Sequence, residues 1–312
     1  MVDKIILISG VTASGKSGLA LLLAQKFGGI VINADSMQIY EGLPILSAQP
    51  SRDDLLLTEH KLYSFLSPYS SNNVFDWIAL AMAEIKKTFS SDKIPIVVGG
   101  TGMYITRLIN GIKDAPSTDK NLRVELDKLY DKIGWNGFIE LVAKIDPKSF
   151  RKIKKNDKQR LIRIYEIYKT SGKKASDLDN KENTYFFERN NIFHINVLPE
   201  RDVIYNRCED RFRKILVDAI DEVRIFMKNY PDILDGYYSI KNTIGLAQIS
   251  KYLNNEINYE EMFELSVRET RHYAKRQYTW FRNQFKYVDF LFDKVPNTAD
   301  TNSLLKKIGQ FL

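Results

Sequence analysis

The segment with the clearest chemical meaning lies near the start of the chain, where a lysine and a serine follow the second of two glycines. Residues 10–17 read GVTASGKS, which matches the pattern GxxxxGK[ST]. An apolar run precedes the segment and a helical apolar pattern follows it, so backbone N–H groups and a helix N-terminus can wrap an anion. We therefore predict a di- or triphosphate site, with Ser17 able to hold Mg²⁺. Its residues are Gly10, Val11, Thr12, Ala13, Ser14, Gly15, Lys16 and Ser17.

A carboxylate and a hydroxyl follow two other apolar runs. P-loop proteins that hydrolyse phosphates usually end a further strand in an acidic residue, but here the run 94–98 ends in Gly-Gly-Thr-Gly, with Thr101 as its polar residue. Asp35 closes the run VINAD instead. Side chains at the carboxyl ends of parallel strands face the ligand crevice, which makes Asp35 and Thr101 candidate site residues. Each could also serve only as the cap of the turn or helix that follows.

The elements that must position these residues alternate along the chain. Apolar runs at 5–8, 29–35, 93–100 and 192–198 predict strands, and 74–89 predicts a helix between two of them. From residue 113 to about 193 the strand signals stop, and the sequence becomes helical, basic and aromatic. We predict an α/β fold: a P-loop parallel-sheet core, residues 1–112 plus 194–312 with C-terminal helices, and an inserted all-helical domain, residues 113–193.

Composition limits the class of protein. The chain has 312 residues, 44% of them hydrophobic, and a net charge of +7. The single Cys208 excludes an internal disulfide framework, and one cysteine with three histidines offers no zinc cluster. No apolar run reaches membrane-spanning length, so we expect a cytoplasmic protein without a membrane partner, and a monomer.

Two segments of the chain are rich in positively charged residues. Residues 151–163 hold seven Lys or Arg, and residues 267–282 interleave Arg and Lys with Tyr, Trp and Phe. Either segment alone is typical of a solvated helix face. Together, with aromatic rings among the charges, they favour a surface for an RNA backbone and unstacked bases.

Five segments in register resemble one enzyme family. GVTASGKS, ADSMQIY, VVGGTGMYI, DKQRLIRIYEI and YAKRQYTWFR occur in the order and at about the spacing of bacterial tRNA dimethylallyltransferases, the tRNA isopentenyltransferase or IPP transferase family. The resemblance implies transfer of a dimethylallyl group from dimethylallyl diphosphate to N6 of the adenosine 3′ to the anticodon, adenosine 37 of the tRNA. The P-loop would then bind a leaving group, which accounts for the missing acidic residue after residue 98.

The resemblance also implies roles for individual residues. Asp35 would take the proton from N6, Lys16 and Mg²⁺ would stabilise the diphosphate, and Thr101 would face the reacting centre as a third catalytic residue. Contacts with the tRNA anticodon stem-loop are implied for Asp35, Ser36, Met37, Gln38, Thr101, Arg123, Gln159, Arg160, Leu161, Ile162 and Arg163. The sequence departs from the family pattern at Val11, at residues 47–50, and at Leu246 and Ala247.

Three alternatives stay open on the residues alone. A nucleoside-monophosphate-type kinase would bind and turn over ATP on the same kind of core and need no RNA. An adenylate isopentenyltransferase would prenylate free AMP, ADP or ATP. A non-catalytic RNA-binding protein with a nucleotide switch would not need Asp35. The basic insertion and the basic aromatic tail helix favour an RNA acceptor.

Overall fold

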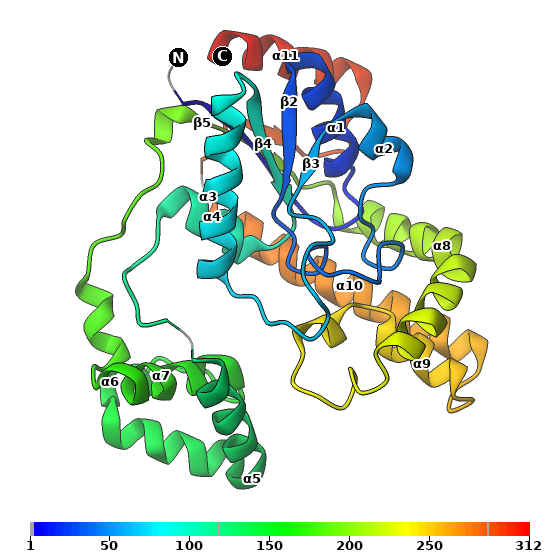
Figure 1. Ribbon diagram of the computed structural model, residues 1–312. Coiled ribbons are helices and arrows are strands. Elements are labelled where there is room, and N and C mark those ends of the chain that lie inside the picture. Colours follow the sequence, from blue (N-terminus) through cyan, green and yellow to red (C-terminus); the bar gives the residue numbers. More distant parts are fainter. Residues whose placement is uncertain (1–2, 118, 286) are drawn as a thin grey trace. The chain divides into compact units, whose positions relative to one another are not determined.

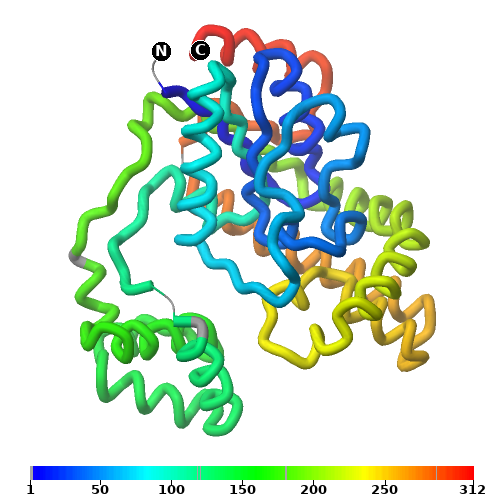
Figure 2. Tube along the Cα trace, in the orientation of Figure 1, coloured from blue at the N-terminus to red at the C-terminus, as the bar shows by residue number. Residues whose placement is uncertain are grey.

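The chain forms two compact units, each with its own hydrophobic core. The computed structural model describes residues 3–117, 119–285 and 287–312. The core unit comprises Met1–Ile109 and Phe187–Leu312, and the helical unit comprises Asn110–Phe186. Residues 187–193, which we assigned to the insertion, thus group with the core unit, because they lead directly into one of its strands. Figure 2 traces the chain out of the core unit into the helical unit and back.

The described part of the core unit contains a six-stranded parallel sheet in the order β3-β2-β4-β1-β5-β6 (Figure 1). The strands are β1 (Ile5–Gly10), β2 (Gly29–Asn33), β3 (His60–Lys61), β4 (Ile94–Gly99), β5 (Ile192–Val197) and β6 (Phe290–Phe292). The four strands expected from apolar runs are confirmed, as is the α/β class. The other two, β3 and β6, are too short to give a sequence pattern.

Helices complete the core unit: α1 (Lys16–Phe27), α2 (Arg52–Leu57), α3 (Val74–Ser90), α4 (Gly102–Asn110), α8 (Arg201–Asn229), α9 (Leu246–Leu253), α10 (Tyr259–Gln284) and α11 (Thr298–Phe311). Buried side chains of α1 and α11, such as Leu23 and Leu304, share one hydrophobic cluster with the sheet. A second cluster joins α8, α9 and α10 to the segment 39–46. These helices therefore have a fixed packing beside the carboxyl ends of the strands.

The helical unit is built on three helices in its described residues. They are α5 (Lys120–Ile145), α6 (Pro147–Phe150) and α7 (Lys158–Ser171), followed by a short 3₁₀ segment, Ala175–Asn180. Gly134 interrupts α5 with a left-handed backbone, φ 67°. Six buried side chains form the core of the helical unit: Leu126, Phe138, Val142, Leu161, Ile162 and Ile164. None of the helices within the described residues of the chain is long and apolar enough to span a membrane.

Candidate active site

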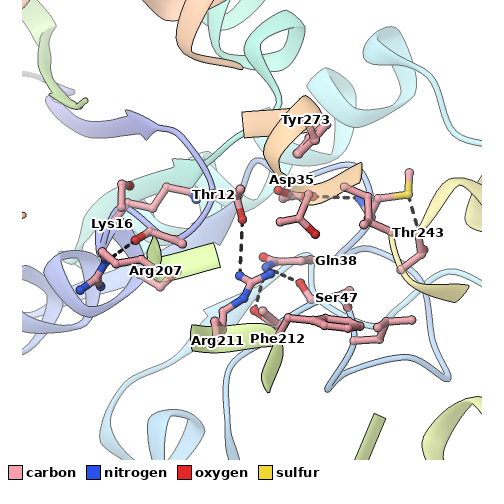
Figure 3. Close-up of a pocket in the computed structure, with 18 of the residues that line it drawn as sticks. Thr12, Lys16, Asp35, Gln38, Ser47, Arg207, Arg211, Phe212, Thr243 and Tyr273 are labelled. Carbon is pink, nitrogen blue, oxygen red and sulfur yellow. Dashed lines mark hydrogen bonds between the residues drawn. The ribbon is translucent and has the colours of Figure 1, made fainter. Parts of the chain in front are cut away.

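A cavity of about 830 Å³ opens in the core unit where β1 and β2 end. Four segments and two helices line it: Thr12–Gly18, Asp35–Gln38, Leu46–Ala48 and Asn242–Ile244, with parts of α8 and α10. Figure 3 shows Thr12 and Lys16 on one side of Asp35, and Tyr273 of α10 above it. The sequence-predicted phosphate loop and the predicted base are therefore brought to one cavity.

The loop after β1 has the backbone of an anion cradle. Ala13 and Gly15 both have left-handed φ values, 59° and 95°. Gly10 packs so tightly that an added Cβ would lie 2.4 Å from the carbonyl oxygen of Val197. The Ser14 hydroxyl is buried without a hydrogen-bond partner. A buried polar atom without a partner is costly, and an anion oxygen at the loop would satisfy it.

Positive charge surrounds this loop. Arg207 donates from Nε to the carbonyl of Ala13 (2.7 Å), and Arg211 donates to the Thr12 hydroxyl (3.4 Å). Burial lowers the pKa of Lys16 to about 8, an effect opposed by Asp35 and reinforced by Arg211. Burial also lowers the pKa of Arg211, whose Nε has no partner. Together with Lys214 and Arg276, these groups make the cavity suited to a multiply charged anion.

The site also fits Mg²⁺ held together with a phosphate ligand. Ser17 lies in the first turn of α1, is exposed and lines the cavity. Within the described part of the chain, no group of three His, Cys, Asp or Glu is placed to hold a metal by itself. Mg²⁺ binds few protein ligands and takes the rest from phosphate and water, so one serine hydroxyl beside an anion cradle suits it.

Asp35 is oriented by its own turn. Its Oδ1 accepts a hydrogen bond from the backbone N–H of Met37 (3.0 Å), and its own N–H donates to Asn33 (2.8 Å). The capping interpretation of Asp35 is therefore correct, and it does not exclude the catalytic one. One carboxylate oxygen holds the turn while the residue lines the cavity.

Thr101 connects a second strand end to the same turn. Its hydroxyl accepts from the N–H of Ser36 (2.9 Å) and donates to the Ser36 hydroxyl (3.2 Å). Gln38 donates both amide hydrogens to the carbonyls of Ser47 and Ala48 (3.0 and 2.8 Å). The polar residues predicted around Asp35 thus form one hydrogen-bonded loop assembly.

Several functional side chains were not found from the sequence. Arg207 and Arg211 are four residues apart on α8, and Lys214 follows three residues later, which places all three on one helix face. This spacing in residues 207–214 is the sequence signal that could have indicated a basic helix face. Tyr273, whose pKa burial raises with a further contribution from Asp35, also lines the cavity and lies within the tail segment.

The tRNA-contacting run predicted for residues 159–163 is corrected in part. Leu161 and Ile162 are both 0% exposed, because they face the core of the helical unit. Their side chains are not available to RNA. Gln159 and Arg160 are exposed, and Arg163 is half-buried.

Gln159 and Arg163 of this run join a network with Arg123, which itself lies 3.9 Å from the Glu166 carboxylate. Arg123 donates to Gln159 and pairs with Asp127 (3.2 Å). Arg163 pairs with the buried Glu166 (2.9 Å) and donates to the carbonyl of Pro116 (2.6 Å). The structure therefore brings Arg123, Gln159 and Arg163 together, as one surface group, on the helical unit.

Comparisons with known proteins agree with the geometry. The family model described as IPP transferase matches residues 38–284, and one described as isopentenyl transferase matches residues 3–65. A tRNA dimethylallyltransferase of Orientia tsutsugamushi (strain Ikeda) is 36% identical over 90% of this chain and 92% of its own length. One from Rickettsia canadensis (strain McKiel) is 36% identical over 97% and 92%.

Solved structures give the same result. A eukaryotic dimethylallyltransferase acting on tRNA superposes with a TM-score of 0.82 at 27% identity, covering 98% of this chain and 77% of that one. The tRNA isopentenylpyrophosphate transferase of Bacillus halodurans superposes with a TM-score of 0.66 at 29% identity, covering 99% and 98%. Because the family model spans most of the sequence and the relatives match over nearly their full length, the chain belongs to the IPP transferase family.

Proposed function

We propose that this protein transfers a dimethylallyl group from dimethylallyl diphosphate to N6 of the adenosine 3′ to the anticodon of tRNA, releasing diphosphate. The relatives that match over most of their length are named tRNA dimethylallyltransferases. The observation that carries the proposal is that one cavity is lined both by the anion loop with Lys16 and by Asp35. The reaction needs both groups at once.

The loop side of the cavity suits a leaving group. As the allylic C–O bond breaks, its electron pair goes to the diphosphate, on which negative charge increases. Lys16 and Arg211 line the cavity together with the loop 13–17, and we expect these groups to stabilise that charge. Ser17 would hold Mg²⁺, which when bound neutralises part of the diphosphate charge.

The Asp35 side of the cavity suits the acceptor. The lone pair of the adenine amine is delocalised into the ring, so its attack on the prenyl carbon requires loss of a proton. Asp35 accepts that proton while Oδ1 stays bonded to the N–H of Met37. The adenosine must leave the stack of the anticodon loop to reach this cavity, which costs only a few kcal/mol for a loop base.

The other functions fit the observations less well. An enzyme for free adenine nucleotides does not need the helical unit. The surface of that unit brings Arg123, Gln159 and Arg163 together. A kinase would be expected to carry an acidic residue after β4, where this chain has Gly100 and Thr101. We propose an enzyme that acts as a monomer in the cytoplasm, where its tRNA substrate is found.

A mass measurement tests the proposal. The protein is incubated with Mg²⁺, dimethylallyl diphosphate and an anticodon stem-loop carrying adenosine 3′ to the anticodon, and the RNA is weighed. We expect a gain of one dimethylallyl group, and no gain when inosine, which lacks the amine, replaces that adenosine. Parallel tubes carry AMP or ATP in place of the RNA, and prenylated AMP without prenylated RNA would support the free-nucleotide enzyme. ATP turnover with neither product would support the kinase.

A further inference from the structure

One buried amide joins the two sides of the active site. Gln277 lies on α10 and is 5% exposed. Its Oε1 accepts a hydrogen bond from the backbone N–H of Thr12 (2.8 Å), and its Nε2 donates to the carbonyl of Gly100 (2.8 Å). These two partners fix the orientation of the amide, because a flipped amide would place oxygen against oxygen and nitrogen against nitrogen.

The contact with Thr12 defines which part of the loop can hold the anion. The N–H of Thr12 is bonded to Gln277 and the N–H of Ser14 to the carbonyl of Val11 (3.3 Å), so neither group is free for an anion. Gln277 thereby anchors the diphosphate loop at Thr12.

The contact with Gly100 reaches the other side of the site. Gly100 precedes Thr101, whose hydroxyl accepts from Ser36, the residue that follows Asp35. A Cβ added at Gly100 would lie 2.4 Å from Nε2 of Gln277 and 3.4 Å from Oδ2 of Asp35. Tyr273, one turn earlier on α10, lines the same cavity as Asp35. The Gln277 amide and the Asp35 carboxylate therefore both lie close to Gly100, in the loop after β4.

We propose that Gln277 is a positioning residue that fixes the separation between the diphosphate loop and the Asp35–Thr101 side of the cavity. This inference rests on the proposed prenyl transfer. In-line attack requires the leaving diphosphate and the attacking amine to be held on opposite sides of one carbon. A misplacement of about 1 Å can lower the rate about a hundredfold. Gln277 touches neither substrate and acts through Thr12 and Thr101.

Substitution with Glu tests the chemistry of the amide. The Gln277→Glu carboxylate can accept from Thr12 but repels the Gly100 carbonyl, whereas the protonated acid has the same shape as the amide and donates to Gly100. We expect kcat to fall about 10- to 100-fold at pH 8, with KM for dimethylallyl diphosphate and the Kd of tRNA within about threefold of wild type. The ratio of variant to wild-type kcat should rise as pH falls toward 6. Asp35, Tyr273 and Lys16 are present in both proteins, so the ratio isolates residue 277.

Two further variants keep the result unambiguous. Gln277→Met has similar volume and no hydrogen bond, so its kcat should be low at every pH and not recover in acid. Ser266→Ala is the matched control, since the buried Ser266 hydroxyl on the same helix bonds only to the carbonyl of Met262. Its kcat should stay at the wild-type value. Wild-type kcat in both Gln277 variants, or a lowered melting temperature as the sole effect, would overturn the inference. An inactive wild-type protein would overturn the proposed function as well, and the two failures are thus distinguishable.

Discussion

The two units of the molecule present their functional residues in different ways. In the core unit, the phosphate loop and the Asp35 turn follow strand ends, and every residue from Thr12 to Gly18 lines the cavity. In the helical unit, the run 159–163 lies on α7, and two of its five members are buried. A loop after a strand can turn a whole run of residues toward a ligand, whereas a helix turns each successive residue by about 100°.

This difference separates catalysis from recognition. Catalytic groups must be held within a fraction of an ångström, and the core unit achieves this by backbone hydrogen bonds at strand ends. The helical unit offers a surface of cations held by carboxylates, such as Arg163 on Glu166. We expect substitutions in the two units to affect different measured quantities.

The largest effect should come from Asp35→Asn in the core unit. The amide keeps an oxygen for the N–H of Met37 but cannot take a proton, so we expect kcat to fall about 10²- to 10⁴-fold. The Kd of tRNA should change by less than about threefold. Single-turnover prenylation and a binding assay on the same RNA measure the two quantities.

The matched control for Asp35 is Asp210→Asn. Asp210 also lines the cavity, from α8, and plays no part in the proposed proton transfer. If Asp35→Asn abolishes tRNA binding while the bound complex reacts at the wild-type rate, Asp35 is a recognition residue and the division between the units does not hold.

In the helical unit, Leu161→Ala should reduce stability. Truncating a fully buried leucine costs about 2–4 kcal/mol in the free energy of unfolding. Hydrogen exchange of residues 158–171 should accelerate, while exchange in the β1 segment stays at the wild-type rate. Arg160→Ala, at the exposed neighbouring position, should leave exchange unchanged and weaken tRNA binding instead. Equal effects of both variants on exchange would contradict the assignment of the two faces of α7.

Acid should weaken the core unit. Burial lowers the pKa of His194 to about 3, and its Nε2 lies 2.8 Å from the Ser9 hydroxyl. A histidine in the unfolded chain has a pKa near 6.5. Between that pH and about pH 3, the unfolded chain binds a proton at His194 that the folded chain does not bind. The free energy of unfolding should therefore decrease as pH falls, by about 2 kcal/mol at pH 5.

The His194→Gln variant isolates this effect, since it should lack that part of the pH dependence in denaturant titrations. All three histidines, His60, His194 and His272, lie in the core unit. Hydrogen exchange at pH 5 should therefore show the acid loss in the core unit alone. An equal slope for His194→Gln and wild type would show that His194 can be protonated without unfolding.

The smallest effect should come from surface charge on the helical unit. Lys154 and Lys155 are exposed, whereas Lys158 already pairs with Asp127 and Asp131 (3.2 and 2.9 Å). Changing Lys154 and Lys155 to Gln should flatten the salt dependence of tRNA binding by about one log unit for each phosphate that the protein no longer neutralises. Adding Lys158→Gln to this variant should change the slope of the salt dependence less than the change at Lys154 or at Lys155 does. A variant with Lys26 and Lys86 of the core unit changed to Gln controls for net charge.

Prediction from sequence succeeded for the structure where one local pattern determines the backbone. Residues 10–17 specify their loop because glycine and lysine spacing fixes how the backbone meets an anion. Asp35 was found because it ends an apolar strand. Leu161 and Ile162 were misassigned because a contiguous run was carried over whole, without the helical period that buries part of it.

Long-range contacts were beyond such patterns. Arg211 and Gln277 reach the site only because α8 and α10 pack beside the strand ends, 199 and 265 residues away along the chain from Thr12. A charged or polar side chain on a long helix has the same local sequence whether it faces solvent or a cavity. The helical unit's start near residue 110 was close to the prediction, whereas its end at Phe186 was not marked by any composition change.

The buried cations of the diphosphate loop have a consequence for turnover. Lys16 and Arg211 lose water on folding, and both have lowered pKa values as a result. An anion beside these two cations is bound more tightly the more negative charge it carries. Inorganic diphosphate carries more negative charge than its prenyl ester. The enzyme is therefore subject to inhibition by its own by-product. We expect turnover to slow as free diphosphate accumulates, and a pyrophosphatase in the solution to restore the initial rate by removing it.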